Sequence, residues 1–183
     1  RRTCRDRLPC SSSCTALNSA ATLIVSLAGD YDAIVAPTTT SGTGWSGLDV
    51  MLNAVLPGDS VVAFVNGTFS GIDALTVRMK AATREELRAN PMDPKPVSVT
   101  VVNVPHGQSV TKAVIDSALA SHKPKWAVMA HWETGSGRIN DIRAFSDACE
   151  AHGVLGLVDA VSSLGIADFA IDDYPGIVGW ASC

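Results

Sequence analysis

The sequence predicts an α/β protein whose mixed, mainly parallel β-sheet is flanked by helices. From residue 16 onward, blocks with apolar residues at helical spacing alternate with short strand-like blocks, and Gly and Pro separate them. The strand-like blocks are continuous runs of Val, Ile and Leu, which is typical of sheets buried on both faces. Strands that alternate with helices in this way indicate βαβ units and parallel strands.

The first part of the chain is expected to begin with a helix over 16–29, because its apolar residues recur at helical spacing and Gly29 provides a C-terminal stop. A short buried strand follows at 32–37. A second helix is expected over 47–56 and ends at a Pro-Gly-Asp turn.

The middle of the chain continues with a strand at 60–65 and a helix over 73–87, which ends before a proline-rich stretch. A strand at 97–104 and a helix over 111–122 come next. Both strands are rich in valine, which favours extended structure.

The last part contains a strand at 126–130, a helix over 141–153 and strands at 154–159 and 177–181. Asp141 is a suitable N-cap for the helix, and a glycine closes it.

Composition and charge limit the possible functions. The 183 residues carry a net charge of -4, with 46% hydrophobic and 17% charged residues, so a nucleic-acid partner is not expected. The most apolar run is interrupted by Asp159 and by glycines, so no membrane span is expected. Five cysteines without regular spacing favour a reducing compartment.

Two segments are expected from this pattern. Residues 1–15 show no periodicity and would form an irregular N-terminal segment, either a frayed terminus or the remnant of a leader. Residues 16–183 would form one large domain.

Four loops follow strands and are expected at the carboxyl edge of the sheet, where α/β proteins bind ligands. They are SGTG at 41–44, NGTF at 66–69, HWETGSG at 131–137 and DAVSS at 159–163.

The SGTG loop could bind an anion through its backbone N–H groups, its hydroxyls and the following helix N-terminus. Its spacing fits neither GxGxxG nor a P-loop, and a plain structural turn is an equal alternative.

Asp159 would emerge from a buried strand, where an unpaired carboxylate is costly. It would need a distant Arg, a metal or a cationic ligand atom, unless it only caps a turn through nearby N–H groups.

Aromatic and polar residues of the other loops offer further chemistry. Phe69 could lie against a planar ring, although a core position is the commoner role of a Phe. His131 and Glu133 could form a pair at a loop entrance, and no metal site is expected because a third ligand is missing. A glycosylation sequon begins at Asn66 and is expected to have no role in a reducing compartment.

In this order, the motifs SGTG, LPGD, NGTF, HWETGSG, HG and LVDAVSSLG resemble those of the class V aminotransferases. This family of pyridoxal-phosphate enzymes includes the alanine- or serine-glyoxylate and aminoethylphosphonate-pyruvate transaminases. The resemblance covers the chain from about Tyr31 to its end. It implies a fold type I large domain at 16–183, without the C-terminal small domain, in a homodimer.

The resemblance implies a role for each matching residue. The cofactor phosphate would be held by Ser41, Gly42 and Thr43. The pyridine ring would lie between Phe69 and Val161. Thr134 would lie near the phenolic oxygen of the cofactor, and Asp159 would pair with the protonated ring nitrogen as the catalytic residue present in this chain.

The implied function is transfer of an amino group from a small amino acid or amino-phosphonate to a 2-oxo acid such as glyoxylate or pyruvate. The cysteine pattern favours the cytoplasm as the location, with an organelle as the alternative. The family's Schiff-base lysine would lie beyond Cys183, since no lysine occurs at the corresponding place. The alternatives are a lyase or desulfurase with the same cofactor, or a non-catalytic module that binds a phosphorylated ligand.

Overall fold

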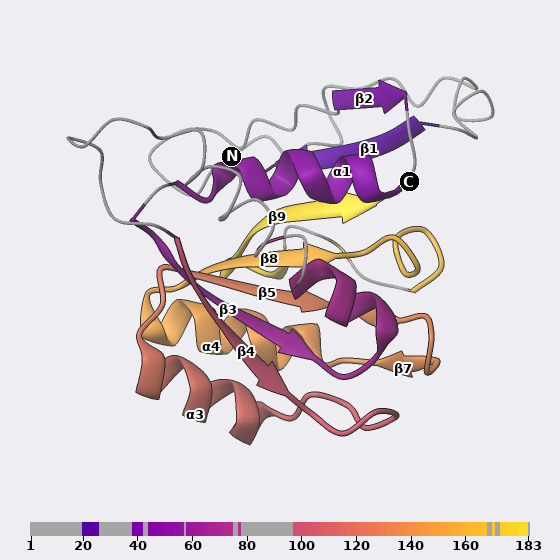
Figure 1. Cartoon of the computed structure of the whole chain (residues 1–183). Coiled ribbons are helices and arrows are strands. Elements are labelled where there is room, and N and C mark those ends of the chain that lie inside the picture. Colours follow the sequence, from indigo (N-terminus) through magenta and orange to yellow (C-terminus); the bar gives the residue numbers. More distant parts are fainter. Residues whose placement is uncertain are drawn as a thin grey trace.

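A computed structural model describes the central and C-terminal parts of the chain in most detail (Figure 1). The described residues are 20–25, 38–41, 44–56, 58–74, 77, 97–167, 170 and 173–182. The irregular segment expected at 1–15 and the strand expected at 32–37 lie outside these ranges, as does most of the helix expected over 73–87.

A seven-stranded mixed sheet organises the described residues, in the order β2-β1-β9-β8-β5-β3-β4. Its strands are β1 (Ala20–Val25), β2 (Thr38–Ser41), β3 (Ser60–Val65), β4 (Ser98–Asn103), β5 (Trp126–Ala130), β8 (Leu155–Asp159) and β9 (Ile177–Ser182). The five strands from β9 to β4 run parallel, and β1 is antiparallel to both β9 and β2. The predicted mixed, mainly parallel α/β fold is confirmed.

Two helices cover one face of the sheet, α3 (Lys112–His122) and α4 (Ile142–His152). Thr111 caps α3 and Asp141 caps α4, each by accepting a hydrogen bond from a backbone N–H in the first turn. Both predicted helices are therefore confirmed, including the N-cap at Asp141 and the left-handed C-cap at Gly153.

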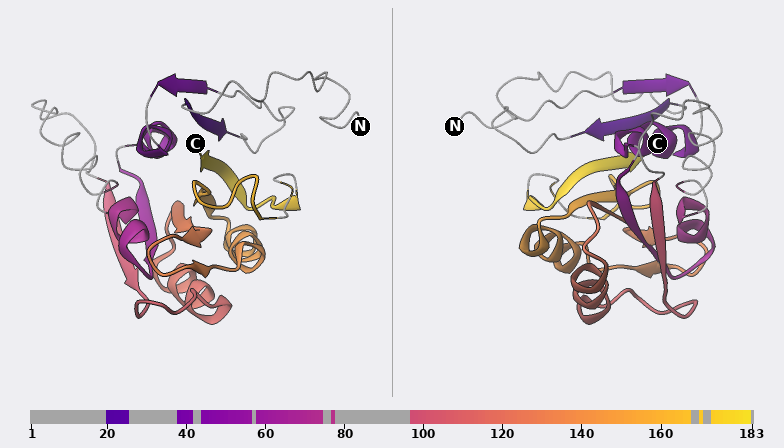
Figure 2. Two further views of the ribbon diagram at one scale, coloured as in Figure 1. Left: turned by 90° about the vertical axis from the view of Figure 1, so that its right-hand side faces the viewer. Right: turned by 60° about the vertical axis from the view of Figure 1, so that its left-hand side comes forward.

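The opposite face carries α1 (Gly44–Met51), which continues into the short 3-10 helix η3 (Leu52–Ala54) (Figure 2). Alternate residues of β3 show why both faces are covered. Val62 and Phe64 pack in the cluster under α3 and α4, whereas Val61 packs in the cluster under α1. A strand buried on both faces must be apolar throughout, as this one is.

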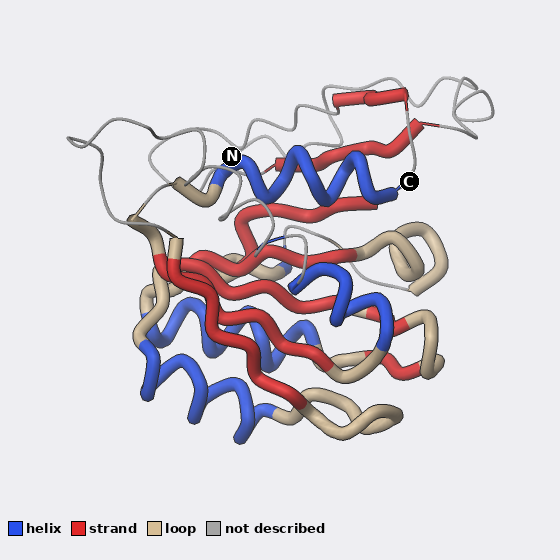
Figure 3. Tube along the Cα trace, in the orientation of Figure 1, coloured by secondary structure: helices blue, strands red, loops and turns tan. Residues whose placement is uncertain are grey.

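The helix predicted over 16–29 is wrong, because Ala20–Val25 forms β1 (Figure 3). This run is short and contains Thr22, Ile24 and Val25, whose β-branched side chains fit a pleated strand. Hydrophobic periodicity alone does not distinguish a helix from a strand in so short a run. The pairing of residues 20–25 with β9 on one side and β2 on the other makes it a strand.

Two further helices begin earlier than expected. The helix predicted over 47–56 begins at Gly44, and residues 68–74 are already helical ahead of the expected start at Asp73. Both starts bring a helix N-terminus to the carboxyl edge of the sheet. In the part of the chain that the structure describes, no helix has the length and apolar character needed to span a membrane.

Candidate functional site

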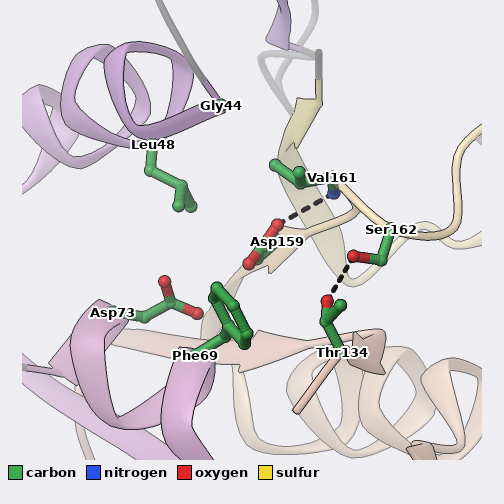
Figure 4. A pocket seen from close by; sticks show the side chains of 8 residues that line it. All are labelled: Gly44, Leu48, Phe69, Asp73, Thr134, Asp159, Val161 and Ser162. Atoms are coloured by element: carbon green, nitrogen blue, oxygen red, sulfur yellow. Dashed lines mark hydrogen bonds between the residues drawn. The ribbon is translucent and has the colours of Figure 1, made fainter. Parts of the chain in front are cut away.

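A pocket of about 200 Å³ lies at the carboxyl edge of the parallel strands, beside the end of β8 (Figure 4). It is built by α1, the helical segment 68–74, the loop after β5 and the turn after β8. Its lining residues are Gly44, Leu48, Phe69, Asp73, Thr134, Asp159, Val161 and Ser162. Four of the residues singled out in the sequence therefore meet at one place: Phe69, Thr134, Asp159 and Val161.

Asp159 is the last residue of β8 and is only 9% exposed. Its Oδ1 accepts a hydrogen bond of 2.9 Å from the N–H of Val161, which is the turn-capping contact considered above. None of the residues that line the pocket is basic, so no Arg or Lys side chain among them neutralises this carboxylate.

The surroundings of Asp159 raise its pKa. Burial is the largest cause, and the nearby carboxylate of Glu133 adds to it, whereas the hydrogen bond from Val161 opposes the rise. A positively charged ligand atom at this position would offset the cost of the buried anion.

Two apolar side chains face the pocket from different elements (Figure 4). Phe69 belongs to the helical segment 68–74 and is 39% exposed, so it is not part of the core. Val161 follows β8 and is half-buried. A flat ring placed in the pocket would therefore meet an aromatic and a branched aliphatic surface.

The hydroxyl groups of Thr134 and Ser162 hydrogen-bond to each other at the pocket (Figure 4). Thr134 directly follows β6 (Trp132–Glu133), in the turn that connects it to β7 (Arg138–Ile139), and β6 lies in the stretch 131–137 that was expected to be a loop. Because each hydroxyl can donate or accept, the pair can adapt to an oxygen of a ligand.

Glu133 has a role that the sequence did not reveal. It is fully buried, and its carboxylate accepts hydrogen bonds from the backbone N–H groups of Phe69 (3.2 Å), Ser70 (2.8 Å) and Gly135 (3.0 Å). Burial raises its pKa, but these donors more than compensate and bring the pKa below its ordinary value. Glu133 thus caps the helical segment 68–74 and fixes the backbone that carries Phe69.

His131 and Glu133 have different partners. The Nδ1 of His131 lies 2.9 Å from the Oγ of Ser163, and burial lowers its pKa, which favours the neutral ring. Within the described ranges, no group of three or more His, Cys, Asp or Glu residues could hold a metal ion.

Of the SGTG loop, the structure describes only the first and last residues. Ser41 ends β2, Gly42 and Thr43 lie outside the described residues, and Gly44 begins α1 and lines the pocket. A Cβ added at Gly44 would lie 2.8 Å from Cγ2 of Val161, so any larger residue at this helix start would force the Val161 side chain to shift. The N-terminus of α1 therefore opens toward the pocket.

Asn66 anchors the loop that precedes Phe69. Its side-chain amide donates to Oδ1 of Asn140 (2.9 Å) and to the carbonyl of Gln108 (2.8 Å), and the residue is 1% exposed. An amide that is buried and donates two hydrogen bonds is not available for glycosylation. Asn66, the first residue of the sequon, therefore has a structural role.

Sequence reasoning also missed Leu48, Asp73 and Ser162 as pocket residues. Ser162 lies in the DAVSS motif, which was expected at the carboxyl edge of the sheet, and this position could have identified it as a pocket residue. Leu48 and Asp73 carry no such signal, because their positions depend on how two helices turn toward the sheet.

Comparison with known proteins identifies relatives of this chain. It is 32% identical over 133 residues to an alanine–glyoxylate aminotransferase of Callithrix jacchus, covering 72% of this chain and 28% of the relative. It is 33% identical over 143 residues to a serine–glyoxylate aminotransferase of Arabidopsis thaliana, covering 74% of this chain and 31% of the relative. The chain thus spans less than a third of the length of these curated relatives. No family model matches the sequence.

The fold is also similar to solved structures. A crystal structure of an alanine–glyoxylate aminotransferase from Nostoc sp. matches with a TM-score of 0.65 and 27% identity, covering 79% of this chain and 34% of that one. Sequence and fold therefore point to the same group of proteins.

Proposed function

Because the chain belongs to the class V aminotransferases, which share the fold type I architecture, we propose that it forms the cofactor-binding part of a pyridoxal-phosphate-dependent transaminase. The reaction would move an amino group from a small amino acid or amino-phosphonate to glyoxylate, pyruvate or a similar 2-oxo acid. The observation that carries the proposal is the buried carboxylate of Asp159 in a pocket whose lining residues include no cation.

The residues of the pocket fit this cofactor. A flat pyridinium ring needs apolar surfaces on its faces and an anion at its nitrogen, and Phe69, Val161 and Asp159, which line one pocket, would supply them. The hydroxyl of Thr134 would bind near the phenolic oxygen. Asp73 contributes a buried oxygen without a hydrogen-bond partner among the described residues, which also indicates a site built for a polar ligand.

The phosphate group would bind at the SGTG loop. Gly44 opens the N-terminus of α1 toward the pocket, and backbone N–H groups at a helix start attract anions. Ser41, Gly42 and Thr43 would supply the remaining donors.

When bound, the cofactor supplies an electron-withdrawing ring that stabilises negative charge at the Cα atom of the amino acid. Asp159 would keep the proton on the ring nitrogen, and its burial excludes water that would weaken this ion pair. Phe69 and Val161 would hold the ring plane, and Glu133 would hold the backbone of Phe69 in place.

Asp159→Asn tests the proposal in the complete gene product that contains this sequence. The variant should still bind pyridoxal phosphate, since the ring contacts remain, but its transamination rate should fall by about 100-fold or more. Asp116→Asn, an exposed position on α3 paired with Lys112, is the matched control and should keep full activity. Near-normal activity of Asp159→Asn would contradict the proposal.

The proposal includes a homodimer in the cytoplasm. The family resemblance supports the dimer, and the buried free thiol of Cys149 is consistent with a reducing compartment. Light scattering of the complete gene product should give twice the mass of one chain, and a monomer that retains activity would exclude the dimer.

A further inference from the structure

A second carboxyl group faces Asp159 across the pocket. Asp73 belongs to the helical segment 68–74, is 3% exposed and lines the same pocket as Asp159 (Figure 4). Its Oδ2 is sealed from solvent and has no hydrogen-bond partner among the described residues. A carboxyl group in this position is costly unless it is protonated or meets a ligand.

The groups around Asp73 are acidic. Asp159 approaches from the end of β8 and Glu133 from β6, and none of the residues that line the pocket is basic. Burial, and then these two carboxylates, raise the pKa of Asp73 well above its ordinary value. A proton shared between the two Asp side chains would raise the pKa of Asp73 further and lower that of Asp159.

We propose that Asp73 and Asp159 form a carboxyl pair that shares one proton and presents a single negative charge to the ring nitrogen of the cofactor. Asp73 is a positioning residue in this pair, because it donates to Asp159 and acts on the cofactor through it. The inference rests on the proposed function, which places the ring nitrogen at Asp159.

The pair would set how tightly the ring nitrogen holds its proton. A carboxylate that accepts a hydrogen bond from Asp73 is a weaker base than a free one, so it stabilises the pyridinium less than Asp159 alone would. An apolar side chain at position 73 removes this donor, whereas an amide of the same shape retains one.

The test measures the ring nitrogen directly in the complete gene product, loaded with pyridoxamine 5'-phosphate that carries ¹⁵N in the ring. The ¹⁵N chemical shift is followed against pH in the wild type, Asp73→Leu and Asp73→Asn. The Leu variant should titrate about one pH unit higher than the wild type, and the Asn variant close to the wild type. The proposed carboxyl pair is overturned if the titration midpoint of Asp73→Leu equals that of the wild type. It is also overturned if the midpoint of Asp73→Asn shifts as far as that of Asp73→Leu.

A second measurement needs no cofactor and keeps the two proposals separable. The infrared spectrum of the apo protein at pH 7 should contain the carbonyl band of a protonated carboxyl group, and Asp73→Asn should lose it. Absence of this band in the wild type, or its survival in Asp73→Asn, overturns the carboxyl pair. A wild type that shows the band but does not bind pyridoxamine 5'-phosphate overturns instead the proposed function, and with it the role assigned to the pair.

Discussion

Gly67 and Glu133 lie so close together that the Glu133 side chain fills the space where a Cβ of residue 67 would lie. The two residues are 66 positions apart in the sequence. Their contact fixes the position of the first turn of the helical segment 68–74, which carries Phe69. The contact explains why a glycine precedes the helical segment 68–74.

Gly67→Ala should therefore destabilise the protein by about 1–3 kcal/mol, because the new methyl group forces a buried carboxylate to move. Chemical denaturation measures the loss. Gly71→Ala is the matched control, since its nearest neighbour, Cγ1 of Val65, is 3.7 Å away and an alanine favours the helix. Equal stability of the two variants would show that the Glu133 side chain moves aside freely.

Glu133→Gln should lower the free energy of unfolding by about 1.5–3 kcal/mol at pH 7, because an amide accepts the three backbone N–H groups less well than a carboxylate. The folded-state pKa of Glu133 lies below its ordinary value of 4.5, so the stabilisation is complete above that value and is lost as the pH falls through the folded-state pKa. The difference between wild type and variant should shrink in that range. The exposed Glu150→Gln is the control and should leave the free energy of unfolding at pH 7 nearly unchanged. A Glu133→Gln deficit that stays constant to pH 2 would exclude the charge as its origin.

Asn140→Ala should cost about 3 kcal/mol, because the Asn140 side chain accepts from the N–H of Val110 and from Asn66 and donates to the carbonyl of Ala130. Its removal leaves buried polar groups unpaired at the edge of the pocket. Thermal unfolding measures the effect, with the exposed Asn103→Ala as control. If both variants unfold at the same temperature, the network carries little of the stability.

Phe69→Ala should weaken cofactor binding about 3- to 10-fold, whereas Phe69→Trp should retain it, because the proposed contribution is an aromatic face rather than a specific atom. Both changes leave the hydrogen bond from the Phe69 backbone to Glu133 available. Fluorescence titration with pyridoxamine 5'-phosphate gives the two affinities. Unchanged binding in Phe69→Ala would remove Phe69 from the proposed site.

The central strands could be predicted to the residue. The strands expected at 60–65 and 126–130 coincide with β3 and β5, because strands buried on both faces are apolar throughout and end abruptly at polar residues. The helix over 141–153 was also predictable, since its two ends carry local signals at Asp141 and Gly153.

The failures have a common physical origin in contacts between distant parts of the chain. Residues 20–25 became a strand through pairing with β9 and β2, which hydrophobic periodicity alone does not reveal. The role of Glu133 depends on backbone donors 63 and 64 residues earlier in the sequence. Asp73 likewise faces Asp159 only after its helix is fixed at its N-terminus, so a single acidic residue in a helical pattern gave no signal of the pocket.

The antiparallel pairing of β1 with β9 also has a consequence for biosynthesis. Thr22 pairs with Ser182, so β1 leaves the ribosome long before its partner strand exists. At about 5–20 residues per second, the delay is on the order of 10–30 s. During this interval β2 can pair with one edge of β1, but the edge that β9 later covers stays open, and an open strand edge of a nascent chain promotes aggregation.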